Sequence, residues 1–282
     1  MGKVYDALRK AESERTRRVE PATAPPSHEW DRPTRARDQR KEPFWRRFVS
    51  RSREASAAAN DVGAPNKRRI AMLQPDSYVA EQFRTLRARI DSIAGERPVR
   101  TITITSATKG DGKTIAAVNF ALVTAMSVGR RVLLVDCDMR EPQVHRTLGL
   151  RPETGLAEVL TDQASLDDAI IKVDGINLEV LPVRALPPNP SELLASAKMR
   201  QTVEELARNY DTVVLDSPAS LGIPDAKSIS ELTDGMLLVV RADKTSEEDV
   251  EAALDVLDRR RILGLILNDA QLSSNSTRGY TY

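Results

Sequence analysis

The sequence is poor in cysteine and has no long hydrophobic run. Its 282 residues contain a single cysteine, Cys137, so no internal disulfide can form and a reducing compartment is indicated. No stretch approaches the roughly 18 consecutive apolar residues that a membrane-spanning helix needs. The first residues alternate charged and apolar side chains and lack the apolar core of a signal peptide. We therefore expect a cytoplasmic protein whose membrane contacts are peripheral.

The near-neutral net charge conceals two oppositely charged parts. Residues 1–70 hold 18 Lys and Arg against 10 Asp and Glu, a net charge of +8. The remaining residues hold 24 against 31, a net charge of −7. A basic arm on an acidic body suggests an anionic partner for the arm. Composition alone leaves open whether this partner is a membrane surface, an acidic protein or nucleic acid.

Residues 1–70 are predicted to be an arm or linker. Residues 3–18 have the spacing of a short amphipathic helix, and residues 19–69 are rich in proline, charge and small side chains. Such a stretch cannot bury enough apolar surface to fold alone. Within it, residues 42–51 interleave phenylalanine and tryptophan with arginine. This cluster either packs on the folded body or anchors the protein at anionic lipid headgroups.

Residues 71–270 show the pattern of an α/β domain. A helix is predicted over 78–93, and six apolar, β-branched runs follow it, separated by helical patterns. These runs are 99–106, 132–136, 176–182, 211–216, 235–241 and 262–268. Near-continuous apolar strands between helices indicate a parallel sheet that is covered on both faces. We predict a doubly wound, mostly parallel sheet, followed by a short flexible tail over 271–282.

A phosphate-binding loop is predicted at residues 107–114. The sequence matches G-x-x-x-x-G-K-[ST] except that Ala107 replaces the first glycine, and it lies between a predicted strand and a helical pattern. Its backbone N–H groups would surround the phosphates of ATP at the positive end of the helix. The predicted nucleotide-binding residues are Thr108, Lys109, Gly110, Asp111, Gly112, Lys113, Thr114 and Ile115.

Individual positions of the loop have separate roles. Gly110 and Gly112 permit the tight backbone path. Lys113 would bridge the β- and γ-phosphates, and Thr114 would place its hydroxyl on Mg²⁺. Partition and division-site ATPases carry a signature lysine five residues before the loop lysine, a position held here by Thr108. Lys109 is out of register with that lysine and is best explained as a solvated loop residue.

Aspartates end two of the predicted strands. Asp136 and Asp138 are two residues apart, so on an extended strand both carboxylates would lie on one face, and Cys137 would point to the other as a small buried hydrophobe. Asp216 ends another strand, where phosphate-loop proteins keep a metal-linked aspartate. Because ligands of parallel sheets bind at the carboxyl ends of the strands, these acids would support Mg²⁺. The simpler alternative is a set of solvated strand-end aspartates.

Two further polar residues lie at predicted strand ends. Asn268 closes the last strand and would either read the edge of adenine or simply end the strand. Arg140 follows the aspartate pair and would either pair with an aspartate or contact phosphate.

The motifs together resemble those of bacterial tyrosine kinases of the capsule and exopolysaccharide type. The three nucleotide motifs of that family are matched by residues 106–114, 133–140 and 213–218. EQFRTLR at 81–87 matches its E-x-x-R-x-x-R helix, and PPNPSELL at 187–194 matches the segment between the two halves of its sheet. The resemblance covers the chain from about residue 70 to its end.

The resemblance implies a role for each matching residue. Lys113 would stabilise the transferring phosphate, and Asp136 would orient or deprotonate the attacking tyrosine. Asp138 and Asp216 would support the metal together with Thr114. The helix residues Glu81, Arg84 and Arg87 would make contacts between subunits of a ring; by their spacing alone they also fit a charged surface helix.

The resemblance also implies acceptors and partners. The family's tail is rich in acceptor tyrosines, and here only Tyr280 and Tyr282 stand in that place. Fourteen extended residues reach at most ~50 Å, which allows phosphorylation of a neighbouring subunit. The implied partners are protein tyrosine substrates and a membrane-embedded polysaccharide co-polymerase that activates the kinase at the inner face of the membrane. No nucleic acid is expected.

Three functions therefore compete. The leading one is an ATP-dependent tyrosine autokinase that regulates polysaccharide polymerisation or export. The second is a partitioning or positioning ATPase without kinase activity, favoured by the tyrosine-poor tail and disfavoured by Thr108 and by EQFRTLR. The third is a scaffold that binds nucleotide without turnover, disfavoured by the intact lysine and aspartates.

Overall fold

The computed structural model describes residues 74–96 and 99–270. The predictions for residues 1–70, with their helix and aromatic cluster, and for the tail over 271–282 fall outside the described residues.

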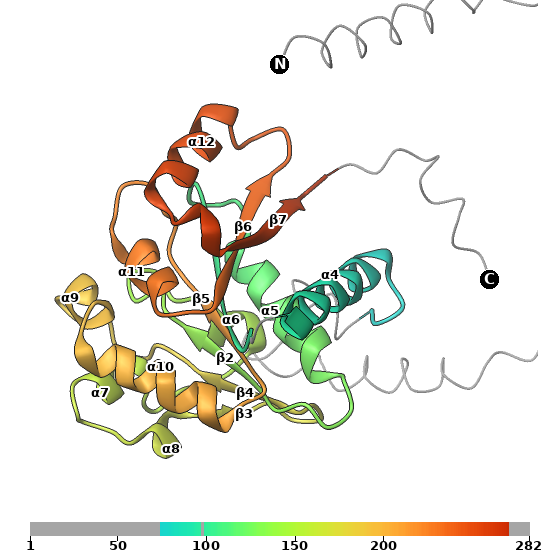
Figure 1. The fold of residues 1–282 in the computed structure, drawn as a ribbon. Helices are drawn as coiled ribbons and strands as arrows, with labels where there is room; N and C mark the ends of the chain where they lie inside the picture. The colour runs from blue at the N-terminus through green and yellow to red at the C-terminus, as the bar shows by residue number, and fades with distance from the viewer. Residues whose placement is uncertain (1–73, 97–98, 271–282) are drawn as a thin grey trace, which may run out of the picture. The chain divides into compact units, whose positions relative to one another are not determined.

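A seven-stranded sheet lies at the centre of the described chain (Figure 1). Its strands are β1 (Thr101–Ser106), β2 (Val132–Asp136), β3 (Ile171–Lys172), β4 (Leu178–Leu181), β5 (Thr212–Asp216), β6 (Gly235–Arg241) and β7 (Ile262–Asn268). Their order across the sheet is β3-β4-β2-β5-β1-β6-β7, and all neighbours are parallel except β3 and β4. The predicted doubly wound, mostly parallel sheet is confirmed. The strand missed was β3, whose two residues are too short to give a pattern.

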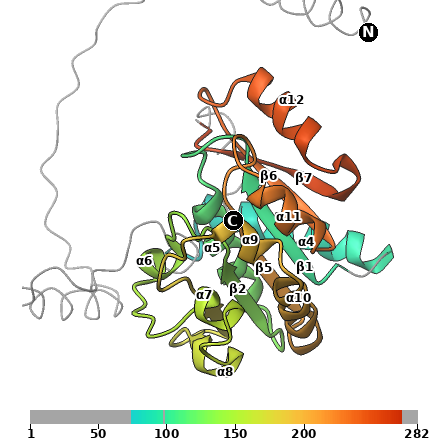
Figure 2. The ribbon, with the colours of Figure 1, turned by 90° about the vertical axis from the view of Figure 1, so that its left-hand side faces the viewer.

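Helices cover both faces of the sheet (Figure 2). The first face carries α4 (Tyr78–Glu96), α5 (Lys113–Ala125) and α6 (Val144–Leu148). The second face carries α7 (Leu156–Leu160), α8 (Leu166–Ala169), α9 (Pro190–Leu194), α10 (Ala197–Asn209), α11 (Asp225–Glu231) and α12 (Glu247–Val256). The predicted helix over 78–93 is confirmed as α4.

Alternation along the strands divides the core into two layers. Val132 and Leu134 of β2 pack into the first layer, whereas Leu133 and Val135 pack into the second. The central strands β2 and β5 are buried along their whole length, as expected for parallel strands between helices. By the same alternation, the last residue of each of these strands lies on the side of α5.

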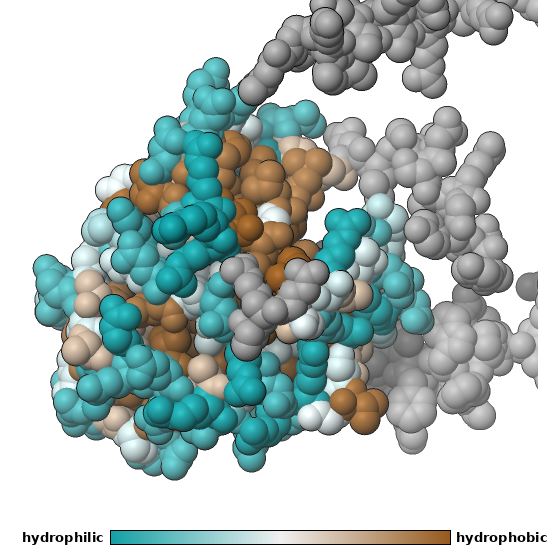
Figure 3. All heavy atoms as spheres, viewed as in Figure 1, coloured by the Kyte–Doolittle hydropathy of each residue, from teal (hydrophilic) through white to brown (hydrophobic). Residues whose placement is uncertain are grey.

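The edge strand β7 is less covered than its neighbours. Leu265 and Leu267 alternate along it and are 57% and 64% exposed. In Figure 3, hydrophobic surface gathers where Figure 1 draws β6 and β7. None of the helices in residues 74–96 and 99–270 is long and apolar enough to span a bilayer.

Candidate active site

The predicted site residues meet at the carboxyl edge of the sheet. Residues 107–112 connect β1 to the first turn of α5, and β2 and β5 end beside them. Asp136 and Asp216 are register partners on these two parallel strands, so their side chains project to the same side. The parallel arrangement therefore brings together motifs that are more than 70 residues apart in sequence.

The loop over 107–112 has the geometry of an anion site. Gly110 and Gly112 have φ values of 94° and 100°, which side-chain-bearing residues rarely adopt. Gly112 is the N-cap of the 13-residue helix α5, and no side chain of the described residues caps its first N–H groups. These free donors and the helix dipole favour a bound anion.

Side chains from other segments of the chain contact the loop. Asn268 Nδ2 donates to the carbonyl oxygen of Asp111 at 2.8 Å, and an added Cβ at Gly112 would lie 2.1 Å from the same Nδ2 atom. Asn268 thus contacts the phosphate loop itself, and the adenine contact remains a prediction. Lys109 forms an ion pair with Glu141 at the surface, in keeping with its reading as a solvated lysine.

Lys113 lies among three aspartates. Its Nζ atom is 2.8 Å from Asp138 Oδ2, and both side chains are largely buried. Burial lowers the pKa of Lys113, but Asp216, Asp138 and Asp136 outweigh burial, so the net shift is upward. Lys113 is therefore held as a cation where the terminal phosphates would lie.

Asp138 is not on the strand, contrary to the prediction. β2 ends at Asp136, and the chain turns so that the N–H of Asp138 donates back to Asp136 Oδ1 at 3.1 Å. The other oxygen of Asp136 accepts from the N–H of Val144. Asp136 is fully buried, and burial followed by repulsion from Asp216 raises its pKa well above the usual range. Its contacts are those of a residue that shapes the turn.

Asp216 has no hydrogen-bond partner for either carboxylate oxygen among the described residues, although it is fully buried. Burial raises the pKa of Asp216 to about 6, while Lys113 and the facing hydroxyl of Thr114 lower it. The Thr114 hydroxyl does not reach hydrogen-bond geometry with Asp216. A buried carboxylate that no protein donor reaches fits a position beside a bound cation.

The described residues contain no group of three or more His, Cys, Asp or Glu side chains arranged to hold a metal ion by themselves. A magnesium ion beside Thr114 and Asp216 would take its remaining ligands from phosphate and water, as Mg²⁺ commonly does.

Two residues of the β2 motif point away from the loop. Cys137 is buried in the second core layer, as predicted, and burial raises its pKa. Arg140 pairs with an aspartate, the first of its two expected roles: its Nε atom is 3.0 Å from the buried Asp225, and Ser191 hydrogen-bonds both of these side chains. Through Ser191, the segment over residues 187–194 is thereby linked to the carboxyl edge of the sheet.

The three residues of α4 that were expected to make subunit contacts do not behave alike. Glu81 and Arg84 form an ion pair, and Arg84 also donates to the Pro75 carbonyl. Arg87 instead donates to the Val123 carbonyl at 3.0 Å and to Ser127 Oγ at 2.6 Å, at the end of α5. Arg87 is therefore engaged within its own subunit, whereas Glu81 keeps an exposed side chain.

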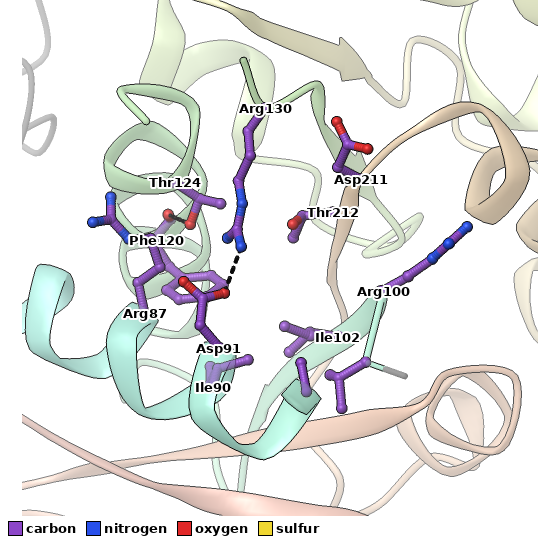
Figure 4. A pocket seen from close by; sticks show the side chains of 12 residues that line it. Arg87, Ile90, Asp91, Arg100, Ile102, Phe120, Thr124, Arg130, Asp211 and Thr212 are labelled. Atoms are coloured by element: carbon purple, nitrogen blue, oxygen red, sulfur yellow. Dashed lines mark hydrogen bonds and ion pairs between the residues drawn. The ribbon is translucent and has the colours of Figure 1, made fainter. Parts of the chain in front are cut away.

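A cavity of about 320 Å³ lies at the opposite edge of the sheet (Figure 4). Arg100 and Thr212, which line it, lie at the amino ends of β1 and β5. An ion pair between Asp91 and Arg130 of 2.7 Å borders it. Because ligands of open parallel sheets bind at the carboxyl ends of strands, this cavity is not the nucleotide site.

Sequence reasoning missed Arg241 and Thr245. Arg241 NH1 donates to the Gly110 carbonyl, and Thr245 Oγ1 donates to the Asp111 carboxylate. Arg241 is the last residue of β6, and Thr245 follows that strand. Because ligand sites lie at the carboxyl ends of parallel strands, the predicted end of β6 was the signal that could have identified both residues.

The fold and this site define a phosphate-loop nucleotide-binding α/β protein. In agreement, residues 99–261 match the model of a family described as AAA domain. At the level of whole sequences, the chain belongs to the bacterial tyrosine-protein kinases.

Three known proteins illustrate this relationship. The tyrosine-protein kinase YwqD of Bacillus subtilis is 38% identical over 75% of this chain and 90% of its own length. The succinoglycan biosynthesis transport protein ExoP of Rhizobium meliloti is 35% identical over 80% of this chain but only 29% of its own length. The solved kinase domain of the Escherichia coli tyrosine kinase ETK is 27% identical, has a TM-score of 0.68, and is matched over 81% of this chain and 89% of that one.

The unpartnered Asp216 predicts a pH dependence of stability in the nucleotide-free protein. Its folded pKa of about 6 lies above the ordinary 3.8. Between these values the folded state binds more protons than the unfolded state, so stability falls as pH rises from about 4 to 6, by up to about 3 kcal/mol. Asp216→Asn should reduce this fall, measured as the urea unfolding free energy at pH 4.5 and 7.5.

The exposed Asp174 supplies the matched control, because Asp174→Asn should keep the wild-type pH dependence. An Asp216→Asn protein whose stability follows the wild-type curve would show that the Asp216 charge is compensated in the native state.

Proposed function

We propose that this protein is an ATP-dependent tyrosine kinase that phosphorylates tyrosines at its own carboxyl end and regulates polysaccharide polymerisation or export. The proposal depends on the buried Asp216, which lies beside Thr114 and the first turn of α5. Within residues 74–96 and 99–270, neither carboxylate oxygen of Asp216 has a hydrogen-bond donor, and no side chain caps that turn. The match to tyrosine kinases selects protein tyrosine, among many possible acceptors, as the group that receives the phosphate.

The free N–H groups of the loop and the first turn of α5 would bind the phosphates of ATP. Mg²⁺, when bound beside Thr114 and Asp216, would supply positive charge against the β- and γ-phosphate oxygens. Lys113 would turn from Asp138 to the phosphates, because a phosphate of ATP competes with the carboxylate for the same ammonium group. Asn268 is proposed to contact adenine from the last strand.

Transfer joins the tyrosine hydroxyl oxygen to the γ-phosphorus and breaks the bond from that phosphorus to the β–γ bridging oxygen, which leaves with ADP. The tyrosine proton needs an acceptor. Asp138 keeps its expected place in support of Mg²⁺, and one of its oxygens is proposed for this further role because it is freed once Lys113 turns to phosphate. For Asp136 we propose the orienting part of its expected role, supported by its full burial and its two backbone hydrogen bonds.

Tyr280 and Tyr282 are the proposed acceptors. They lie 12 and 14 residues beyond Asn268, close enough in sequence to reach the active site of a neighbouring subunit when extended. Each phosphorylation adds about −1.5 to −2 charges to the carboxyl end. Two acceptors therefore allow graded modification.

A ring of subunits is proposed to present the acceptors in trans. Glu81 and Arg84 of α4 are proposed as contacts between subunits, supported by the exposed side chain of Glu81 and the partly exposed side chain of Arg84. Arg87 was expected to join them, but its two bonds to the end of α5 support a different role, holding α4 in place.

The activator is proposed to be a membrane-embedded polysaccharide co-polymerase that recruits the kinase to the membrane. The relationship to a succinoglycan biosynthesis transport protein supports a polysaccharide process. The exposed Leu265 and Leu267 lie on the strand that ends at Asn268, so a partner bound there would lie close to the nucleotide.

Replacement of Lys113 tests the catalytic proposal. Lys113→Met removes the cation at the phosphate position, and we expect autophosphorylation to fall on the order of 100-fold or more. Intact-mass analysis after incubation with ATP and Mg²⁺ should show added phosphate on the wild type only. The surface variant Lys198→Met, which loses only an exposed ion pair, should behave as wild type. Release of phosphate from ATP without any phosphotyrosine would instead favour the partitioning or positioning ATPase.

Removal of the two acceptor hydroxyls tests the tail. With [γ-³²P]ATP, Tyr280→Phe/Tyr282→Phe should lose most of the label because phenylalanine offers no nucleophile. Tyr78→Phe, at the start of α4, should keep it. Full labelling of the double variant would show that the acceptor residues lie elsewhere in the chain.

Variants of Arg84 and Arg87 should separate assembly from stability. Arg84→Ala should weaken self-association, measured by light scattering, and should lower the unfolding free energy less than Arg87→Ala, because it loses one hydrogen bond to a carbonyl, that of Pro75, and a surface ion pair. Arg87→Ala should lower the unfolding free energy by about 1–3 kcal/mol, because it leaves the Val123 carbonyl and Ser127 without their donor. Equal losses of stability in both variants would contradict this division of roles.

A further inference from the structure

The side chain of Asp111 has a role that the loop motif does not specify. Asp111 is 3% exposed, and its carboxylate accepts from the N–H of Thr108 at 3.0 Å and from the Thr108 hydroxyl. A third donor, Thr245 Oγ1, lies 2.9 Å away and comes from the segment after β6. An acid placed so near a phosphate site is tolerable only with such donors.

The hydroxyl of Thr245 is oriented by a second contact. It accepts a hydrogen bond from the N–H of Arg241 at 2.9 Å, and the N–H of Thr245 donates to the Arg241 carbonyl at 3.0 Å. A hydroxyl has one proton to donate. Since the N–H of Arg241 occupies an acceptor position, the proton of Thr245 is committed to Asp111.

Two other contacts fix the direction of the loop peptides. Arg241 NH1 binds the Gly110 carbonyl at 3.3 Å, and Asn268 Nδ2 binds the Asp111 carbonyl at 2.8 Å. In a planar trans peptide, the carbonyl and the following N–H point in opposite directions. The N–H groups of Asp111 and Gly112 are therefore turned away from Arg241 and Asn268, and are free to face a ligand.

We propose that Thr245 is a positioning residue for the nucleotide phosphates, acting through the carboxylate of Asp111. Its hydroxyl joins the end of β6 to the phosphate loop and holds the loop in the conformation in which its N–H groups converge. The ligand is a nucleoside di- or triphosphate with Mg²⁺. The inference rests on the proposed nucleotide site and adds to it a residue outside the loop motif.

The test measures binding of ADP with Mg²⁺ by calorimetry. Thr245→Val keeps the shape and removes the hydroxyl, and Thr245→Ser restores the hydroxyl. We expect about tenfold weaker ADP binding for the valine variant, since a hydrogen bond to a carboxylate is lost, and near wild-type binding for the serine variant. Thr154→Val removes a hydroxyl bound to the Asp168 carbonyl, remote from the loop, and should leave ADP binding unchanged.

A double-mutant cycle with Asp111→Asn distinguishes positioning from a general loss of structure. If Thr245 acts through Asp111, the double variant should bind ADP no more weakly than the weaker-binding single variant. Both substitutions would then disrupt the same interaction, that between the Thr245 hydroxyl and the Asp111 carboxylate. The KM for ATP should rise with kcat changed by less than about twofold, as expected when ground-state and transition-state binding are lost alike. Thermal unfolding without nucleotide should stay near that of the Thr154→Val control.

Each result decides the matter. Wild-type ADP binding by Thr245→Val, no recovery in Thr245→Ser, or additive losses in the cycle would overturn the role of Thr245 while leaving the kinase proposal intact. If Thr245→Val does not fold, Thr245→Ala removes the same hydroxyl and must weaken ADP binding by a similar factor; wild-type binding by that variant would equally overturn the role of Thr245. Absence of ADP binding by the wild type would instead overturn the nucleotide site itself.

Discussion

The excess of negative charge at the carboxyl edge of the sheet governs the candidate active site. Asp136, Asp138 and Asp216 surround one cation, Lys113, within a largely buried region. One lysine does not neutralise three carboxylates. Burial first, and repulsion between the acids second, raises the pKa values of Asp136 and Asp216. A divalent cation beside these acids would relieve the excess of negative charge, while Lys113 would counter the charge of phosphate.

Parallel register explains how the chain can maintain so unfavourable an arrangement. The aspartates stand at the ends of β2 and β5, two central strands that are buried on both faces. The apolar layers on either side stabilise the strands. The positions of the acids are therefore determined by the apolar residues of β2 and β5, which have no part in the chemistry. Function is therefore placed where the core ends, as in other open parallel sheets.

Much of this architecture could be predicted because its signals are local. The apolar runs gave the six longer strands, and strand, loop, Gly-Lys-Thr and helix in succession identified the phosphate loop. The turn after β2 was predicted wrongly, because two aspartates at i and i+2 look the same in sequence whether the strand continues or ends at the first.

The remaining contacts could not be foreseen because they join distant segments. Nothing in EQFRTLR indicates that Arg87 turns to the end of α5 while Arg84 stays near the surface. The donors of Thr245 and Asn268 reach a loop more than 130 residues earlier in the chain. Such pairings depend on how the helices and strands pack, which spacing alone does not determine.

The register pairing of Asp136 with Asp216 has a consequence for any titration of this protein. Two interacting acids release their protons in two macroscopic steps that belong to the pair and not to either residue. An acidic limb in a pH–rate profile would therefore report the combined protonation of both carboxylates. Substituting one of them would displace the ionisation of its neighbour as well as abolish its own.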